Sequence, residues 1–267
     1  MAHQDPLTAY GVALRLAVTR GPEQRASLNK AAYRRLRADI LSCRLSPGRH
    51  VTEKQLVANT GHSVAALRDA LTRLDQEGLI RTAPRKGYQV VPLTEKSVSD
   101  LFVMWRIVGP ELVRLGVAHA DGRALAQARA GFAALDEIAH DIPGAGKAAS
   151  RLLVLLEETF RILAYATDND YLINVFDRIC GDMARVWVLI LQVDPTAAIP
   201  APTGSRVGDM LRQRDADRAA ESARTYIAES HRRVLRVISR RPSVMKGEPA
   251  APPEKEGAES HDRESGL

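Results

Sequence analysis

Residues 46–87 read SPGRHVTEKQLVANTGHSVAALRDALTRLDQEGLIRTAPRKG, which is the pattern of two short helices followed by a hairpin. A tight turn at 59–62 separates the two helices. Ser63 is a suitable N-cap for the second helix, because its hydroxyl can accept a hydrogen bond from an amide of the first turn. Gly78 is expected to end that helix, since glycine adopts the left-handed backbone conformation at low cost.

The second helix has an apolar face and a mixed exposed face. Its expected core residues, which repeat at helical spacing, are Leu67, Leu71 and Leu74. Two short strands are predicted at 79–81 and 88–91, joined by a basic, turn-rich loop at 82–87. Helix, turn, helix and basic hairpin together predict a winged helix-turn-helix, in which the second helix enters the DNA major groove.

The charge of the chain is concentrated in this region. The net charge of the whole sequence is +6, and residues 26–90 contain twelve Lys/Arg against five Asp/Glu. The remainder of the chain is therefore close to neutral. A basic surface at the winged helix is what phosphate neutralisation requires, although basic helices in other proteins are often only solvated faces.

The chain resembles the GntR family of bacterial transcription regulators. The residues that carry the resemblance are Leu45–Gly48, Thr52–Leu56, Gly61–Ser63, Leu67–Leu71, Arg73–Leu74, Glu77–Leu79 and the wing residue Gly87. The resemblance implies that DNA is bound by the first helix of the motif, the start of the recognition helix and the wing. The positions that match are Lys54, Ser63, Val64, Arg68, Arg85, Lys86 and Gly87.

Chemical roles can be assigned to several of these positions. Arg68 can contact a guanine edge or a phosphate with its forked guanidinium, and the alternative is a surface salt bridge with Asp69 or Asp75. Ser63 can donate to a phosphate at the helix N-terminus. Val64 departs from the arginine that is usual in the family, so this helix either contacts thymine methyl groups or binds more weakly and depends on the wing. Gly87 is expected to let the wing approach the minor groove.

The rest of the chain is divided by composition. Residues 1–25 are expected to form a flexible arm, 26–92 the DNA-binding domain, 94–241 a helical domain, and 242–267 a disordered tail rich in Pro, Glu and Gly. The first helix of the DNA-binding domain is expected at 26–44. The helices expected after it are 95–118, 121–139, 149–166, 170–194, 203–213 and 216–240. The fold class is thus mainly α: a winged helix followed by an all-α bundle.

The helical domain resembles the FCD type of effector domain, through Val98–Leu101 with Arg106, the residues around Phe160, and Arg214–Ala220. Many such domains bind a divalent metal with one carboxylate and three histidines. Here the carboxylate aligns to Glu157, and the histidine positions align to Arg161, Gly204 and Tyr226. No metal or other cofactor is therefore expected, since one carboxylate does not hold a metal against water.

The effector pocket is expected to contain Arg106, Glu157, Arg161 and Tyr226. Arg161 is a permanent cation that can bind a carboxylate in bidentate fashion, so an anionic small molecule, most simply a carboxylate, is the expected effector. Alternatively, Arg161 pairs with Glu157 one turn earlier and the pocket is vestigial.

The expected function is a ligand-responsive repressor that binds a palindromic operator in double-stranded DNA as a homodimer. The alternative is a constitutive DNA-binding regulator. No phosphate-binding glycine loop, nucleophile elbow or metal-ligand set indicates an enzyme. The two cysteines, Cys43 and Cys180, have no disulfide or metal spacing. No signal peptide or membrane span is recognisable, so a bacterial cytoplasmic protein, at the nucleoid when bound to DNA, is expected.

Overall fold

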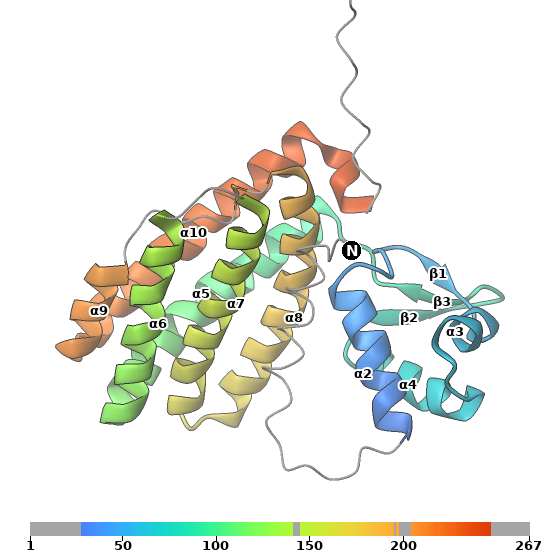
Figure 1. Cartoon of the computed structure of the whole chain (residues 1–267), viewed down its shortest axis with the longest axis horizontal. Coiled ribbons are helices and arrows are strands. Elements are labelled where there is room, and N and C mark those ends of the chain that lie inside the picture. Colours follow the sequence, from blue (N-terminus) through green and yellow to red (C-terminus); the bar gives the residue numbers. More distant parts are fainter. Residues whose placement is uncertain (1–27, 141–144, 195, 198–203, 247–267) are drawn as a thin grey trace, which may run out of the picture.

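A computed structural model describes residues 28–140, 145–194, 196–197 and 204–246. The winged helix lies beside a larger helical bundle, and the chain passes from one to the other directly after the wing (Figure 1). The expected arm at 1–25 and the part of the expected tail at 247–267 lie outside the described residues.

The winged helix consists of helices and a small sheet in the expected order. Its elements are α2 (Leu28–Leu41), β1 (His50–Val51), α3 (Glu53–Thr60), α4 (Val64–Gln76), β2 (Ile80–Ala83) and β3 (Gly87–Val90). The strands form an antiparallel sheet in the order β1-β3-β2. The pair β1–β3 was not predicted, because a two-residue strand has too few residues to show an alternating pattern.

The first helix is shorter than the predicted 26–44. It ends at Leu41, and Cys43 follows with a φ of 54°, in the left-handed region. The Cys43 amide donates to the carbonyl of Ile40 at 3.0 Å, which closes a turn in place of another helical residue. The periodicity of the sequence continues past this turn, so the prediction placed the end of the helix too late.

The two helices of the helix-turn-helix begin and end at capping residues. Thr52 and Gln55 form a capping box at the start of α3, and Gly61 ends that helix with a φ of 70°. The Ser63 hydroxyl accepts a hydrogen bond from the Ala66 amide at 3.3 Å. Gly78 also has a φ of 70°, which agrees with its expected place after the recognition helix.

The predicted apolar face of α4 packs against α2. Leu67, Leu71 and Leu74 are at most 2% exposed, as are Leu36 and Ile40 of α2. Burial of large aliphatic side chains on this scale is the main source of folding free energy. The core of the winged helix therefore lies between these two helices and fixes the direction in which the opposite face of α4 points.

The bundle has the helices that the sequence predicts, with ends shifted by at most four residues. They are α5 (Glu95–His119), α6 (Gly122–His140), α7 (Ala145–Ala166), α8 (Asp170–Val193), α9 (Gly204–Arg212) and α10 (Ala216–Arg240). The long helix α10 packs along α5, and α6 packs against α7 and α9 (Figure 1). Among the described residues, no helix combines the length and the apolar character that a bilayer crossing requires.

The start of the predicted disordered tail is ordered, which corrects the boundary at 242. Residues Pro242–Lys246 form a 3-10 helix, η1, that packs against α8 and α10. Val244 and Met245 are 4% and 6% exposed. These two apolar side chains lie within a polar segment, and their burial supplies the free energy that orders it.

Candidate DNA-binding surface and effector pocket

The face of α4 opposite its core, together with α3 and the wing, is open to solvent. The predicted DNA contacts on this face are all exposed: Lys54, Ser63, Val64, Arg68, Arg85 and Lys86. The side chain of Val64 is 43% exposed at the first position of α4. The structure thus exposes six of the seven residues that the sequence selects.

Arg68 is paired with a residue outside the predicted alternatives. Its Nε donates to both carboxylate oxygens of Glu53, at 3.0 and 3.1 Å. The predicted alternative partners were Asp69 and Asp75 on the same helix, whereas Glu53 is the first residue of α3. The Arg68 side chain is still 65% exposed, so the pair leaves the guanidinium accessible to DNA.

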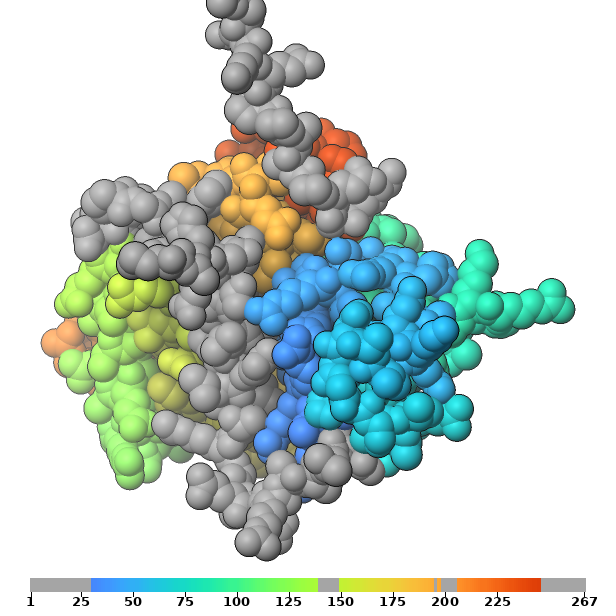
Figure 2. Space-filling view, turned by 45° about the vertical axis from the view of Figure 1, so that its right-hand side comes forward, coloured from blue at the N-terminus to red at the C-terminus, as the bar shows by residue number. Residues whose placement is uncertain are grey.

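The wing is a tight basic turn. Arg85 has a φ of 62°, and the Lys86 amide donates to the carbonyl of Ala83 at 2.9 Å. The turn projects from the surface of the winged helix in Figure 2. This geometry presents two cations at the tip of a hairpin, where they can contact the DNA backbone or the minor groove.

The fold itself requires a glycine at position 87, independently of any contact with DNA. A Cβ on Gly87 would lie 2.5 Å from the backbone oxygen of Val51 and 3.3 Å from Cα of Thr52. The missing side chain therefore makes room for β1 of the same sheet, and the φ of 82° adds a second requirement for glycine. That Gly87 also lets the wing approach the minor groove stays a prediction.

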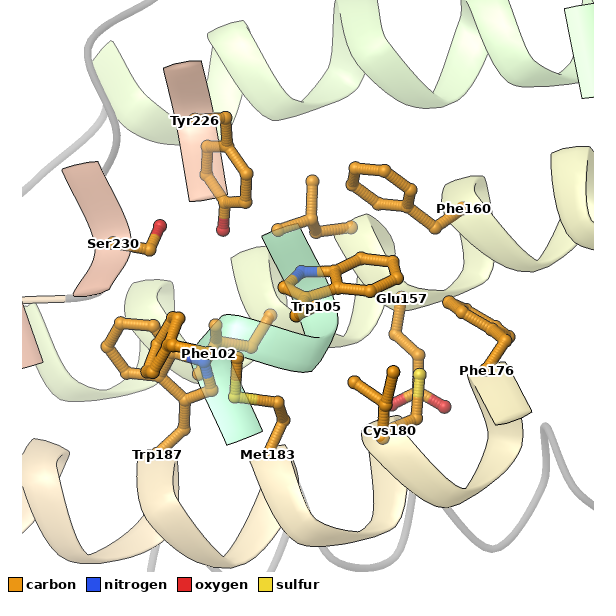
Figure 3. Close-up of a pocket in the computed structure, with 13 residues that line it drawn as sticks. Phe102, Trp105, Glu157, Phe160, Phe176, Cys180, Met183, Trp187, Tyr226 and Ser230 are labelled. Carbon is orange, nitrogen blue, oxygen red and sulfur yellow. The ribbon is translucent and has the colours of Figure 1, made fainter. Parts of the chain in front are cut away.

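A small cavity, the bundle cavity, lies between α5, α7, α8 and α10. Its volume is about 60 Å³ and its lining is almost entirely apolar. Figure 3 shows Trp105 at its centre, with Phe160 and Phe176 beside it and Tyr226 opposite. Both tryptophans and three of the four phenylalanines of the chain line it: Phe102, Trp105, Phe160, Phe176 and Trp187. The helical positions of these scarce aromatic residues are a sequence signal that could have located the cavity.

Two of the four predicted pocket residues line the cavity. Glu157 and Tyr226 do, and burial raises the pKa of the Tyr226 hydroxyl. Arg106 does not, because it lies one residue beyond Trp105 on α5, about 100° further around the helix, and is exposed. Arg161 is buried but does not line the cavity either.

Arg161 instead belongs to a buried ion-pair network. Its Nη2 lies 2.6 Å from Oε1 of Glu157, and its Nη1 contacts the carboxylate of Asp177 on α8. The Arg161 and Glu157 side chains are only 10% and 8% exposed. Burial raises the pKa of Glu157, and the nearby Arg161 charge opposes that shift. Both terminal nitrogens of the expected anion-binding cation are therefore already bound to carboxylates.

The residues at the family's metal positions do not fit a metal ion. Glu157 is held by the permanent charge of Arg161, Gly204 has no side chain, and Tyr226 is a poor ligand while protonated. Among the described residues, no three His, Cys, Asp or Glu side chains are grouped so that they could bind one ion. That the protein binds no metal stays a prediction.

Helix α8 connects the cavity to the winged helix. One of its faces lines the cavity through Phe176, Cys180, Met183 and Trp187. The other face contacts the DNA-binding domain: buried Arg185 donates to the backbone carbonyl of Val91, at the end of the wing. The Cys43 thiol donates in turn to the carbonyl of Arg185 at 3.6 Å. Helix α8 therefore contacts both the cavity and the DNA-binding domain.

A cleft, the interdomain cleft, follows the same boundary. Its volume is about 550 Å³, and its lining includes Tyr33, Arg37 and Glu77 of the winged helix and Arg161, Asp177 and Arg178 of the bundle. Tyr33 donates to a carboxylate oxygen of Glu77, and Arg37 donates to the other at 3.2 Å. The pKa of Tyr33 is raised to about 12, because burial and this hydrogen bond both disfavour the phenolate.

Residues 28–90 define a winged helix-turn-helix domain, and comparison with known proteins gives its family. These residues match the family model described as bacterial regulatory proteins, gntR family. The chain is 22% identical over 147 residues to the HTH-type transcriptional regulator YdhC of Bacillus subtilis (strain 168), across 55% of this chain and 64% of that protein. It is 35% identical over 73 residues to the HTH-type transcriptional repressor RspR of Escherichia coli (strain K12), across 27% and 32%.

Solved structures share the fold of both parts. A transcriptional regulator GntR from Rhodococcus sp. RHA1 superposes with a TM-score of 0.60 at 17% identity, covering 78% of this chain and 97% of that one. E. coli McbR/YncC gives a TM-score of 0.60 at 16% identity, covering 81% and 99%. This chain carries a GntR-family DNA-binding domain. Its matches span less than two thirds of the length of these curated relatives.

Proposed function

We propose that the protein is a transcription regulator that binds a two-fold-symmetric DNA operator as a homodimer. The observation that carries the proposal is the solvent-facing surface of α3, α4 and the wing, on which Lys54, Arg68, Arg85 and Lys86 are exposed in a domain of the GntR family. One winged helix covers one half-site, so two copies related by a two-fold axis match a palindrome.

Repression is the proposed direction of regulation. Two relatives are named as repressors, RspR and GlaR of Escherichia coli. A protein bound across a promoter blocks it by occupancy alone, which requires no further contact surface. The position of the operator determines which genes the protein controls.

The proposed effector is a small molecule with a largely apolar body that enters the bundle cavity. The aromatic lining favours such a body, and Tyr226 and Ser230 supply the polar contacts on α10. A carboxylate on the effector would have to displace Asp177 or Glu157 from Arg161, so the apolar part supplies most of the affinity. Because α8 lines the cavity and holds Val91, its displacement by the effector would move the winged helix.

The second candidate function is a constitutive regulator whose pocket no longer binds an effector. The observation that favours it is the cavity volume of about 60 Å³, compared with roughly 300–1,000 Å³ for ordinary ligand pockets. The network of Arg161, Glu157 and Asp177 points in the same direction, since both terminal nitrogens of Arg161 are paired with carboxylates in the absence of a ligand.

Two measurements test these functions separately. In vitro selection from random duplexes with the full chain should enrich an inverted repeat, and failure to enrich any sequence would contradict the DNA-binding proposal. Thermal shift against aromatic, acyl and carboxylate compounds then separates the candidates. A stabilising compound that also releases the selected duplex supports the ligand-responsive regulator, and a uniformly blank panel supports the constitutive one.

A further inference from the structure

The recognition helix has few side chains that can read a base. Val64 and Ala65 are apolar, and α4 contains only two arginines, Arg68 and Arg73. The guanidinium of Arg73 lies 4.1 Å from the ring centroid of Tyr33, where it packs over α2. Arg68 is therefore the one arginine of α4 that is directed to the DNA-facing surface.

Glu53 holds Arg68 by one edge of its guanidinium. Nε donates to Oε1 and Oε2 of Glu53 at 3.0 and 3.1 Å, and within the described residues Arg68 makes no other side-chain hydrogen bond. The two terminal nitrogens form the edge that makes end-on bidentate contacts to O6 and N7 of guanine. The ion pair with Glu53 uses Nε, which an end-on contact to guanine does not need.

Glu53 is itself fixed by two neighbouring elements. It follows Thr52, whose capping box with Gln55 sets the first turn of α3. The hydrogen bond from Arg68, with a smaller contribution from the nearby Tyr88 hydroxyl of β3, holds the pKa of Glu53 below its ordinary value. The carboxylate therefore stays ionised at neutral pH and joins α3, the recognition helix and the wing.

We propose that Glu53 is a positioning residue for base recognition: by binding Nε, it presents the terminal nitrogens of Arg68 to a guanine in the major groove. The inference rests on the proposed function and adds a source of specificity to it. A flexible arginine contacts phosphates and bases alike, whereas an arginine held at one edge is pre-organised for a single planar partner. Glu53 carries a negative charge towards DNA, so its presence weakens general phosphate binding while it improves discrimination.

The test uses the full chain and a duplex selected in vitro by the wild type. The base pair that Arg68 reads is found as the position at which the Arg68→Ala variant no longer shows a preference. Discrimination is then the ratio of Kd values for the duplex changed at that position and the selected duplex. The variants are Glu53→Ala, Glu53→Gln, the Glu53→Ala/Arg68→Ala double variant, and Asp75→Ala, which removes one exposed negative charge of α4 as a matched control.

We expect Glu53→Ala to lower discrimination by about tenfold, on the scale of one bidentate base contact, with unchanged or tighter binding to unrelated DNA. Glu53→Gln should keep most of the discrimination, because its amide oxygen still accepts from Nε. In the Arg68→Ala background, Glu53→Ala should have no further effect. Unchanged melting temperatures exclude a folding defect.

Three results would overturn the inference while the proposed function stands. Wild-type discrimination in Glu53→Ala would show that Arg68 needs no support, and an equal change on both duplexes, as in Asp75→Ala, would show a charge effect alone. Retention of every base preference by Arg68→Ala would show a phosphate contact. If the wild type selects no sequence at all, the proposed function fails, and this inference fails with it.

Discussion

Arg185, a buried residue of the bundle, donates a hydrogen bond to the backbone carbonyl of Val91, the residue that follows the wing. The arginine is 1% exposed, and its Nη1 lies 3.4 Å from the carboxylate of Asp182. This buried guanidinium of the bundle is therefore hydrogen-bonded to the backbone of the DNA-binding domain. This contact fixes the start of the connection between the DNA-binding domain and α5.

Replacing Arg185 by methionine should loosen the connection without unfolding the winged helix. Methionine fills a similar volume but cannot donate to Val91, so amide hydrogen exchange at residues 91–94 should accelerate while the core of α2 and α4 stays protected. Arg212→Met is the control, because Arg212 forms an exposed ion pair with Asp209, and such pairs contribute little. Unchanged exchange at 91–94 in Arg185→Met would show that other contacts hold the domains together.

Removing Arg161 should produce a pH-dependent loss of stability. Arg161→Met leaves Glu157 buried without its partner, which at neutral pH costs about 3–5 kcal/mol for a deeply buried pair. Burial already raises the pKa of Glu157, and loss of the arginine raises it further. A carboxyl with a raised pKa in the folded state favours folding below its unfolded pKa, and that stability is lost as pH rises through the folded pKa.

The difference in melting temperature between wild type and Arg161→Met should therefore shrink as pH falls from 7 towards 4.5. The Glu157→Gln/Arg161→Met double variant should lack this trend, because its amide does not titrate. A difference that is constant across the range would mean that Glu157 remains accessible to water when its partner is removed.

The 3-10 helix after α10 should contribute measurably to stability. Val244→Ala with Met245→Ala removes two side chains that are 4% and 6% exposed, and the expected loss is about 2–4 kcal/mol. Ser243→Ala in the same helix is exposed and should be neutral. Urea denaturation measures both variants, and equal midpoints for them would show that η1 packs too weakly to stabilise the bundle.

Chelation of metal ions should not affect the protein. Glu157 is bound by Arg161, so no carboxylate at the family's metal position is left for an ion. EDTA should leave the melting temperature and the DNA affinity unchanged, because no bound metal contributes to folding. Stoichiometric zinc or nickel by elemental analysis, removed only with loss of stability, would contradict this assignment.

Local patterns predicted the elements well because each carries its own periodic or capping signal. Both ends of the helix predicted at 216–240 agree with the structure, since a long amphipathic repeat begins directly after the N-cap Asp215. The family resemblance predicted that Tyr226 and Glu157 belong to one pocket, and both line the bundle cavity.

Contacts between elements distant in sequence were not predictable in the same way. Arg185 lies in an apolar helical run, and nothing in its neighbours indicates that Val91 receives its hydrogen bond. Arg68 and Glu53 lie on separate helices, so their pairing depends on the angle between α3 and α4. Helical spacing separates Arg106 from Trp105 by about 100° around α5. The family resemblance nevertheless assigned Arg106 to the pocket, whereas the structure exposes it and places Trp105 in the cavity lining.

The most direct test of the central claim is the salt dependence and stoichiometry of binding to an in vitro selected duplex. We expect two chains per inverted repeat and a steep fall in affinity with rising salt. The Arg85→Ala/Lys86→Ala variant should reduce the slope of log Kd against log salt by about 1 for each phosphate that is no longer neutralised. Wild-type affinity and slope in both this variant and Arg68→Ala would show that the surface of α3, α4 and the wing is not where this protein binds DNA.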